Sequence, residues 1–181
     1  MTDDKLKILG KQTAKVSFII GTVIFGFYFL TSNSGLLFFG FAYIVLAVLF
    51  NLGVLFFLFI RSNKENKLLK TCAFMLLNIP VTLLYCWGSI ILLNTMRVTL
   101  VNSTSDELTD IKITGCETNY IDKLQLGESK TIWVKITGDC SINIDYLANG
   151  QRKEENVAGY VTNDMGQKIT YRIGGVNNEH F

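Results

Sequence analysis

An uncharged apolar segment of 25 residues, Leu36–Ile60, constrains the fold of this chain more than any other part of the sequence. It consists of Leu, Phe, Val, Ile, Ala, Gly and Tyr apart from a single amide, Asn51. An α-helix needs about 20 consecutive apolar residues to cross a bilayer. We therefore expect this segment to be a transmembrane helix, with the lipid bilayer as one partner of the chain.

Two further apolar segments flank this one. The first begins at Val16 and the last ends at Leu93, and all charged residues between these positions fall within 61–70. The sequence thus predicts a transmembrane domain over residues 16–94, with three helices at about 16–32, 36–60 and 69–93. A cleaved signal peptide that ends near residues 32–34 is the alternative interpretation of the first segment.

Positive charges are distributed unevenly around these helices. Residues 1–15 contain four Lys, and residues 61–70 contain three Lys and one Arg, whereas the turn at 31–35 is uncharged. Short segments rich in Lys and Arg that flank transmembrane helices remain in the cytoplasm. We therefore predict a multi-pass protein of the cell or inner membrane, with a cytoplasmic N-terminal segment (1–15) and an extracytoplasmic domain (95–181).

The apolar pattern changes to a period of two after Arg97, which is typical of β-strands. Ile132, Val134 and Ile136 alternate with polar or aromatic residues, and similar alternation marks six strands, or seven if 120–124 also pairs. We expect a meander with a cross-over near 116–128. The predicted fold class is a membrane α-helical domain followed by a small antiparallel β-sandwich, with a small β-barrel as the alternative.

Turn-forming residues separate these expected strands. Asn149-Gly150 is the strongest two-residue hairpin signal in the chain. The links 137–139 and 164–166 each contain Gly and are also expected to join neighbouring strands. The stretch Leu124-x-x-Gly127-Glu-Ser-Lys-Thr131 resembles a turn common in bacterial immunoglobulin-like sandwiches. That resemblance implies an immunoglobulin-like fold class and no particular activity.

The four cysteines divide between the two domains. Cys116 and Cys140 are candidates for a disulfide, because an even number of cysteines outside the membrane favours pairing. Such a bond would close a loop of about 25 residues and stabilise the domain by about 3–3.5 kcal/mol. Two free, buried thiols are the alternative. Cys72 and Cys86 lie in the third expected helix, where packing in lipid explains them.

Catalytic motifs are missing from the sequence. It has no nucleophile elbow, no HExxH, no Gly-rich phosphate loop and no CxxC. The one histidine, His180, is too isolated for a zinc site with cysteines. We therefore expect no enzyme activity, no metal and no cofactor. Residues 95–181 carry nine Lys/Arg and twelve Asp/Glu, a net charge of −3, which argues against nucleic acid as a partner.

Polar residues within the expected helices suggest contacts between them. Asn51 and Asn78 lie at similar depth, so we predict a hydrogen bond between these amides, worth about 0.6–2 kcal/mol. Such a bond either holds the helices together or forms part of a path for a small molecule or ion. Pro80 should kink the third helix, because proline has no backbone N–H.

Trp133 and Tyr160 are expected on the strand faces opposite the aliphatic core. They form either a patch for protein binding or part of a second covered face. Asn102-Ser103-Thr104 matches a glycosylation sequon, which has meaning only in a eukaryotic host.

These features favour a non-enzymatic, membrane-anchored protein that presents its β domain in the cell envelope. We expect a protein partner near the outer membrane surface and a possible homo-oligomer, and an immunity protein against an external toxin is one specific version. An oligomeric membrane effector or channel gated by the β domain is one alternative. A membrane-bound ligand sensor with a cytoplasmic β domain is another, but it violates the positive-inside rule.

Overall fold

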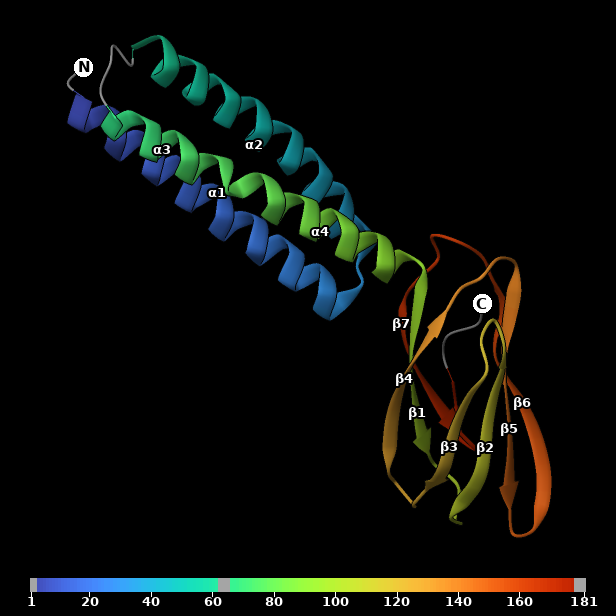
Figure 1. The fold of residues 1–181 in the computed structure, drawn as a ribbon. Coiled ribbons are helices and arrows are strands. Elements are labelled where there is room, and N and C mark those ends of the chain that lie inside the picture. Colours follow the sequence, from blue (N-terminus) through green and yellow to red (C-terminus); the bar gives the residue numbers. More distant parts are fainter. Residues whose placement is uncertain (1–2, 62–65, 178–181) are drawn as a thin grey trace. The chain divides into compact units, whose positions relative to one another are not determined.

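The computed structural model describes residues 3–61 and 66–177, which form a set of long helices followed by β-strands (Figure 1). The chain divides into two compact units, Met1–Ser89 and Ile90–Phe181. They are named here the helical unit and the β unit. The last turn of the final helix, which starts at Ile90, belongs to the β unit.

Three helical stretches in the described part of the chain are long and apolar enough to cross a membrane, namely Asp4–Thr31, Ser34–Ile60 and Lys70–Leu93. This agrees with the expected number of such helices. The helices are α1 (Asp3–Thr31), α2 (Ser34–Arg61), α3 (Asn66–Leu76) and α4 (Asn78–Leu93). The first of them begins well before Val16. The residues before Val16 include lysines and leucines, which are good helix formers, and this segment contains no proline.

The turn between α1 and α2 is short and capped by Asn33. The side-chain oxygen of Asn33 accepts a hydrogen bond of 2.8 Å from the backbone N–H of Gly35. Its carbonyl accepts hydrogen bonds from the N–H groups of Leu36 and Leu37. Side-chain acceptors of this kind satisfy the free N–H groups at the start of a helix. This explains why α2 begins directly after the polar residues.

The third stretch is divided at Leu77 into α3 and α4. Pro80 lies three residues later, and it lacks the N–H that would bond to the carbonyl of Leu76. The interruption at Leu77 therefore lies next to the Leu76 carbonyl, which has no helical N–H donor because residue 80 is proline.

The packed core of the helical unit lies where α1 meets α2 and α3. It consists of Leu6 and Ala14 of α1, Val54 and Leu58 of α2, and Met75 of α3. Gly10 allows this contact, since a Cβ there would lie 2.6 Å from the Cγ2 of Thr71. Many other large apolar side chains are exposed, as expected for helices that face lipid; Phe38 and Phe59 are 74% and 79% exposed.

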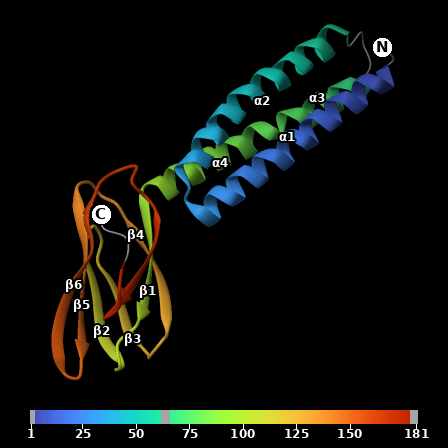
Figure 2. The same cartoon turned by 180° about the vertical axis from the view of Figure 1, so that it is seen from behind.

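The β unit contains seven strands in the described residues (Figures 1 and 2). They are β1 (Thr95–Asn102), β2 (Leu108–Gly115), β3 (Asn119–Leu124), β4 (Ser129–Lys135), β5 (Cys140–Ala148), β6 (Gln151–Val161) and β7 (Lys168–Ile173). They form a three-stranded sheet of order β4-β1-β7 and a four-stranded sheet of order β3-β2-β5-β6. All strand pairs are antiparallel except β1 with β7, which is parallel.

The strand order differs from the expected meander. Among the seven described strands, only β2–β3 and β5–β6 are sequential neighbours that pair, and the chain changes sheets at each of the other four connections between them. The links 137–139 and 164–166 therefore join strands of different sheets and are not hairpins. A glycine turn signals a reversal of the backbone, but it does not specify the strand with which the next segment pairs. Asn149-Gly150 does form the expected hairpin between β5 and β6, with φ values of 51° and 72°.

Both sheets contribute to a single hydrophobic core. The three-stranded sheet supplies Val98, Leu100 and Val134, and the four-stranded sheet supplies residues such as Ile113 and Ile144. All five are fully buried. The alternation seen in the sequence thus reports the side of each strand that faces this core.

Candidate functional site

The amides of Asn51 and Asn78 both donate to α1. The Nδ2 atom of Asn51 donates to the Oγ of Ser17 at 3.0 Å and to the carbonyl of Ala47 at 2.7 Å. The Nδ2 atom of Asn78 donates to the carbonyl of Ala14 at 3.0 Å. Both amides therefore bond to α1, a helix that the prediction from their similar depth did not consider. Within the described residues, the hydrogen bonds of these amides connect α2 to α1 and α4 to α1, and no hydrogen bond joins the two amides directly.

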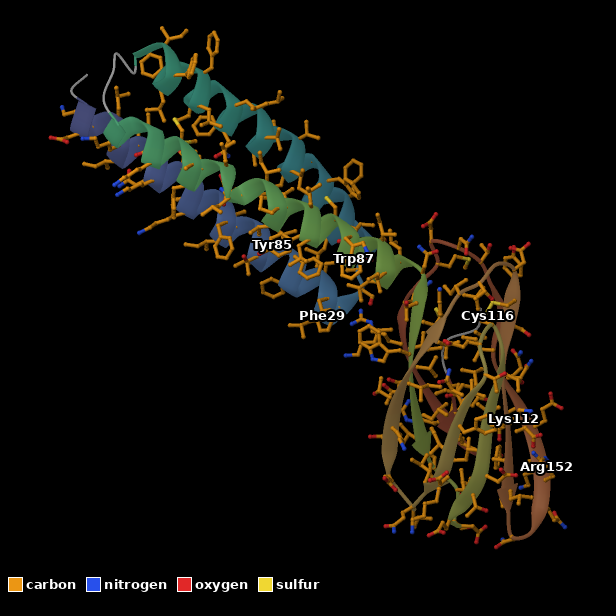
Figure 3. The ribbon with its side chains drawn as sticks, in the orientation of Figure 1. Phe29, Tyr85, Trp87, Lys112, Cys116 and Arg152 are labelled. Atoms are coloured by element: carbon orange, nitrogen blue, oxygen red, sulfur yellow. A yellow bond between two sulfur atoms is a disulfide. The ribbon has the colours of Figure 1, made fainter. Side chains whose placement is uncertain are left out.

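Further polar side chains join the same helices. The hydroxyl of Tyr43 on α2 donates to the carbonyl of Ser17 at 3.1 Å. The hydroxyls of Thr22 on α1 and Tyr85 on α4 are hydrogen-bonded at 2.6 Å. The ring of Tyr85, labelled on α4 in Figure 3, also stacks on Phe25 with centroids 5.0 Å apart. These contacts support close packing of α1 against α2 and α4 in a medium that offers few other hydrogen-bond partners.

A pocket of about 320 Å³ lies between α1, α2 and α4 inside the helical unit. Its wall is mainly apolar, and the polar residues that line it are Ser17, Tyr43, Asn51, Asn78, Thr82 and Tyr85. A smaller cavity of about 50 Å³ shares Gly21, Tyr43, Ile44 and Tyr85 with it and is also lined by Leu36 and Ser89. No Asp, Glu, Lys or Arg of the described part of the chain lines either cavity. The polar groups of this pocket are therefore neutral hydrogen-bonding groups.

One buried polar atom at this pocket has no partner in the part of the chain that the structure describes. The side-chain oxygen of Asn51 is covered by neighbouring atoms and accepts no hydrogen bond from the described residues. A buried acceptor without a donor costs about 1–3 kcal/mol. The amide cannot simply be turned over, because its nitrogen donates to the carbonyl of Ala47.

Cys116 and Cys140 lie in the β unit with their sulfur atoms 1.97 Å apart, which is disulfide distance. Cys116 follows β2 and Cys140 begins β5, so the pair links the ends of two adjacent strands of the four-stranded sheet. Figure 3 labels Cys116 in this sheet. Cys72 and Cys86 in the helical unit are free thiols.

Trp133 and Tyr160 do not share a surface. Trp133 lies on β4, the edge strand of the three-stranded sheet, and Tyr160 lies on β6, an edge strand of the four-stranded sheet. The guanidinium of Arg97 lies 5.6 Å from the centroid of the Trp133 ring. Hydrogen bonds from Thr162 and Tyr160 lower the pKa of Asp139. The two aromatic residues are therefore parts of separate local contacts.

The outer face of the four-stranded sheet carries a different group of exposed side chains. Lys112 pairs in register with Tyr120 on one side and with Asp145 on the other, so all three lie on this face. The ammonium of Lys112 lies 5.8 Å from the centroid of the Tyr120 ring, and Tyr120 is 65% exposed. Arg152 forms an ion pair with Asp145 at 2.7 Å. We name these residues, two of which are labelled in Figure 3, the exposed sheet face.

Asn102 on β1 organises the loops at one end of the β unit. Its Nδ2 donates to the carbonyls of Asp106 and Leu124, at 2.8 Å and 3.0 Å. Its Oδ1 accepts from the backbone N–H and the hydroxyl of Thr104, at 3.0 Å and 2.7 Å. Asn102 is 1% exposed. Although it matches a sequon, its amide nitrogen is buried in these bonds, so a glycan at this position is incompatible with the fold.

Glu155 on β6 accepts hydrogen bonds from two tyrosines. The hydroxyl of Tyr171 on β7 lies 2.9 Å from one carboxylate oxygen, and the hydroxyl of Tyr146 on β5 donates to the other. Burial, the hydrogen bond to Glu155 and its negative charge raise the pKa of Tyr171 to about 12. The same causes, with burial first, also raise the pKa of Tyr146. The pattern of alternation gave no signal for this cluster, because Glu155 appears in a run of charged residues.

Within residues 3–61 and 66–177, no group of three or more His, Cys, Asp or Glu side chains is placed to hold a metal ion. His180, the only histidine, lies outside the described residues.

Comparisons with known proteins add little to this description. No family model matches the chain, and no curated protein matches it. Among solved structures, the chain is similar to one described as "NMR structure of the protein from Eubacterium rectale". The two are 15% identical with a TM-score of 0.35, and the match covers 44% of this chain and 77% of the other. A likeness this weak assigns neither a fold family nor a function. The fold class of this chain therefore comes from its own structure, which has helices of membrane-spanning length followed by two β-sheets.

Proposed function

We propose that this chain is a membrane-anchored binding protein and not an enzyme. The helical unit anchors it in the cell membrane, and the β unit binds a protein partner on the extracytoplasmic side. The observation that carries the proposal is the exposed sheet face, where Tyr120, Lys112, Asp145 and Arg152 share one side of the four-stranded sheet.

Charge and helix length support the orientation. In this proposal each of the three stretches of spanning length crosses the membrane once, so residues 1–15 and 61–70 share one side and the β unit lies on the other. Both of these segments carry four positive charges, which favours the cytoplasmic side for them. A single residue, Asn94, separates α4 from β1, so the first strand begins immediately after the third stretch.

The cysteines are consistent with this orientation. Disulfides persist in compartments outside the cytoplasm, because thiols are kept reduced only inside it. The pair at disulfide distance, Cys116 and Cys140, lies in the β unit, and the free thiols lie in the helical unit.

Residue chemistry supports the exposed sheet face as the partner surface. Tyr and Arg are enriched among the residues that dominate protein–protein binding energies. Tyr120 is an exposed aromatic residue on an edge strand, and the Arg152 side chain is 54% exposed despite its ion pair. These side chains can contact a partner without any change in the core of the β unit.

We further infer that the β unit is an immunoglobulin-like β-sandwich. The support is that its two sheets enclose one common core and that the chain passes between them four times. Such sandwiches often serve as binding modules. An immunity protein that protects the membrane from an external toxin is one specific form of the proposal.

The test is site-specific photo-crosslinking in cells that make the full chain. A benzoylphenylalanine residue replaces Tyr120, and a matched one replaces Thr170 on the exposed side of the three-stranded sheet. We expect a discrete crosslinked protein from position 120 and none from position 170. With the purified partner, Tyr120→Ala and Arg152→Ala should each weaken binding about tenfold, or about 1.4 kcal/mol. Equal crosslinking at both positions, or at neither, would contradict the proposal.

A further inference from the structure

The pocket between α1, α2 and α4 is suited to a ligand that comes from the bilayer. Its volume of about 320 Å³ lies at the lower end of the range typical of small-molecule sites. Residues such as Ile44, Val48 and Leu52 give it an apolar wall. The surrounding helices are of membrane-spanning length, so we expect molecules dissolved in lipid to reach this pocket.

Polar groups from three helices converge on the pocket. Ser17 comes from α1, Asn51 from α2, and Asn78 and Thr82 from α4. Several of these groups hydrogen-bond within the helical unit: Asn51 bonds to Ser17, Asn78 bonds to Ala14, and Thr82 bonds to the carbonyl of Asn78. These bonds fix the positions of the amides before any ligand enters.

The unpaired oxygen of Asn51 defines the chemistry of the ligand. It is an acceptor, so it requires an O–H or N–H donor, and lipid tails supply none. Neighbouring atoms cover it, so a small donor reaches it only when lining side chains move aside. Among the residues that the structure describes, none that lines the pocket is charged and could pair with a phosphate or an ammonium group. A neutral hydroxyl meets all three conditions.

We propose that this pocket binds a neutral, single-chain lipid whose hydroxyl donates a hydrogen bond to the Oδ1 of Asn51. The smaller cavity of about 50 Å³, which shares Tyr43 and Tyr85 with the pocket, has room for a short part of its tail. A long-chain alcohol is the simplest molecule of this class. The inference concerns the helical unit alone and does not depend on the partner or the orientation of the β unit.

Native mass spectrometry of the full chain released from detergent micelles tests this directly. The probes are dodecanol and dodecyl methyl ether, which have the same tail but differ in the O–H donor. We expect dodecanol to form a saturable complex with one alcohol per chain, and the ether to bind at least tenfold more weakly. Asn51→Leu should abolish this preference. Equal binding of the two probes, or no complex with either, would overturn the proposal.

Two matched tryptophan variants locate the site. Ala47 lines the pocket, and its neighbour Leu46 does not and is 67% exposed. Ala47→Trp should therefore eliminate dodecanol binding, while Leu46→Trp leaves it unchanged. Because Ala47→Trp could also disturb folding, a dodecanol analogue with a diazirine in its tail is photolysed with the unmodified protein. Labelling should concentrate on residues 43–55 and 78–85, and labelling spread evenly over the exposed side of α2 would refute the site.

Discussion

The hydroxyl of Tyr171 donates a hydrogen bond of 2.9 Å to Glu155, and this bond joins β7 of the three-stranded sheet to β6 of the four-stranded sheet. Tyr146, which is 1% exposed, donates to the same carboxylate from β5. The Glu155 carboxylate, which accepts from both phenol hydroxyls, thus links the two sheets through β6 and β7, which are edge strands of their sheets. It therefore makes the β unit depend on polar contacts as well as on its apolar core.

Tyr171→Phe should destabilise the β unit by about 1–2 kcal/mol, because it removes one hydrogen bond to a charged, partly buried acceptor. Glu155→Gln should cost at least as much, since it weakens both bonds. Hydrogen exchange of the backbone amides in 95–177 of the full chain measures these losses. Tyr120→Phe is the control, because Tyr120 is exposed and its contact with Lys112 uses the ring. A loss for the control as large as for Tyr171→Phe would exclude the proposed link.

The raised pKa of Tyr171 predicts how stability depends on pH. Its ordinary value is 10.0, and the folded value is about 12. A group whose pKa is raised by folding stabilises the folded state fully at pH values below its pKa in the unfolded chain. This stabilisation is lost as the pH rises through its pKa in the folded protein. The stability of the β unit should therefore fall between about pH 10 and 12. Tyr171→Phe should lose less stability over this range than the unmodified protein, and parallel curves would show that Tyr171 is not responsible.

Loss of the Cys116–Cys140 bond should destabilise the β unit by about 3 kcal/mol, as the chain-entropy model gives for a loop of about 25 residues. The double variant Cys116→Ser with Cys140→Ser tests this in thermal or urea unfolding of the full chain. The double variant Cys72→Ser with Cys86→Ser is the matched control and should change stability little. Alkylation of unreduced protein from cells should modify Cys72 and Cys86 only, and modification of four thiols would show that the bond is absent.

Asn102→Ala should destabilise the β unit by about 3 kcal/mol, because four hydrogen bonds are lost and two carbonyls and one N–H lose a partner. Asn156→Ala is the control. It also removes an amide, but Asn156 is exposed and bonds mainly to Asn143 at 2.7 Å. We expect a loss below about 1 kcal/mol for the control. Similar losses for both variants would contradict the role given to Asn102.

Patterns of hydrophobicity predicted the helices and strands well, because burial on one face leaves a periodic trace in the sequence. The three apolar stretches and the alternation through β1 to β7 are examples. The weak segment 120–124 proved to be most of β3, paired with β2. These features depend on local sequence and on a single face of each element.

Relationships between distant elements were harder to predict. Depth along the helices placed Asn51 near Asn78 but could not show that Ser17 and Ala14 of α1 provide their acceptors. Strand alternation placed Trp133 and Tyr160 opposite the aliphatic core but not on different sheets. The contact of Glu155 with two tyrosines depends on strand order, which local patterns do not contain.

The central claim, a β unit outside the cell membrane, is tested most directly by reporters fused after Phe181. We predict that an alkaline phosphatase fusion is active and that a green fluorescent protein fusion is dark, since the first needs an oxidising compartment and the second does not fluoresce after export in an unfolded state. The same reporters fused within the positive segment 61–70 should behave in the opposite way. An inactive phosphatase with a bright fluorescent fusion after Phe181 would place the β unit in the cytoplasm and contradict the account.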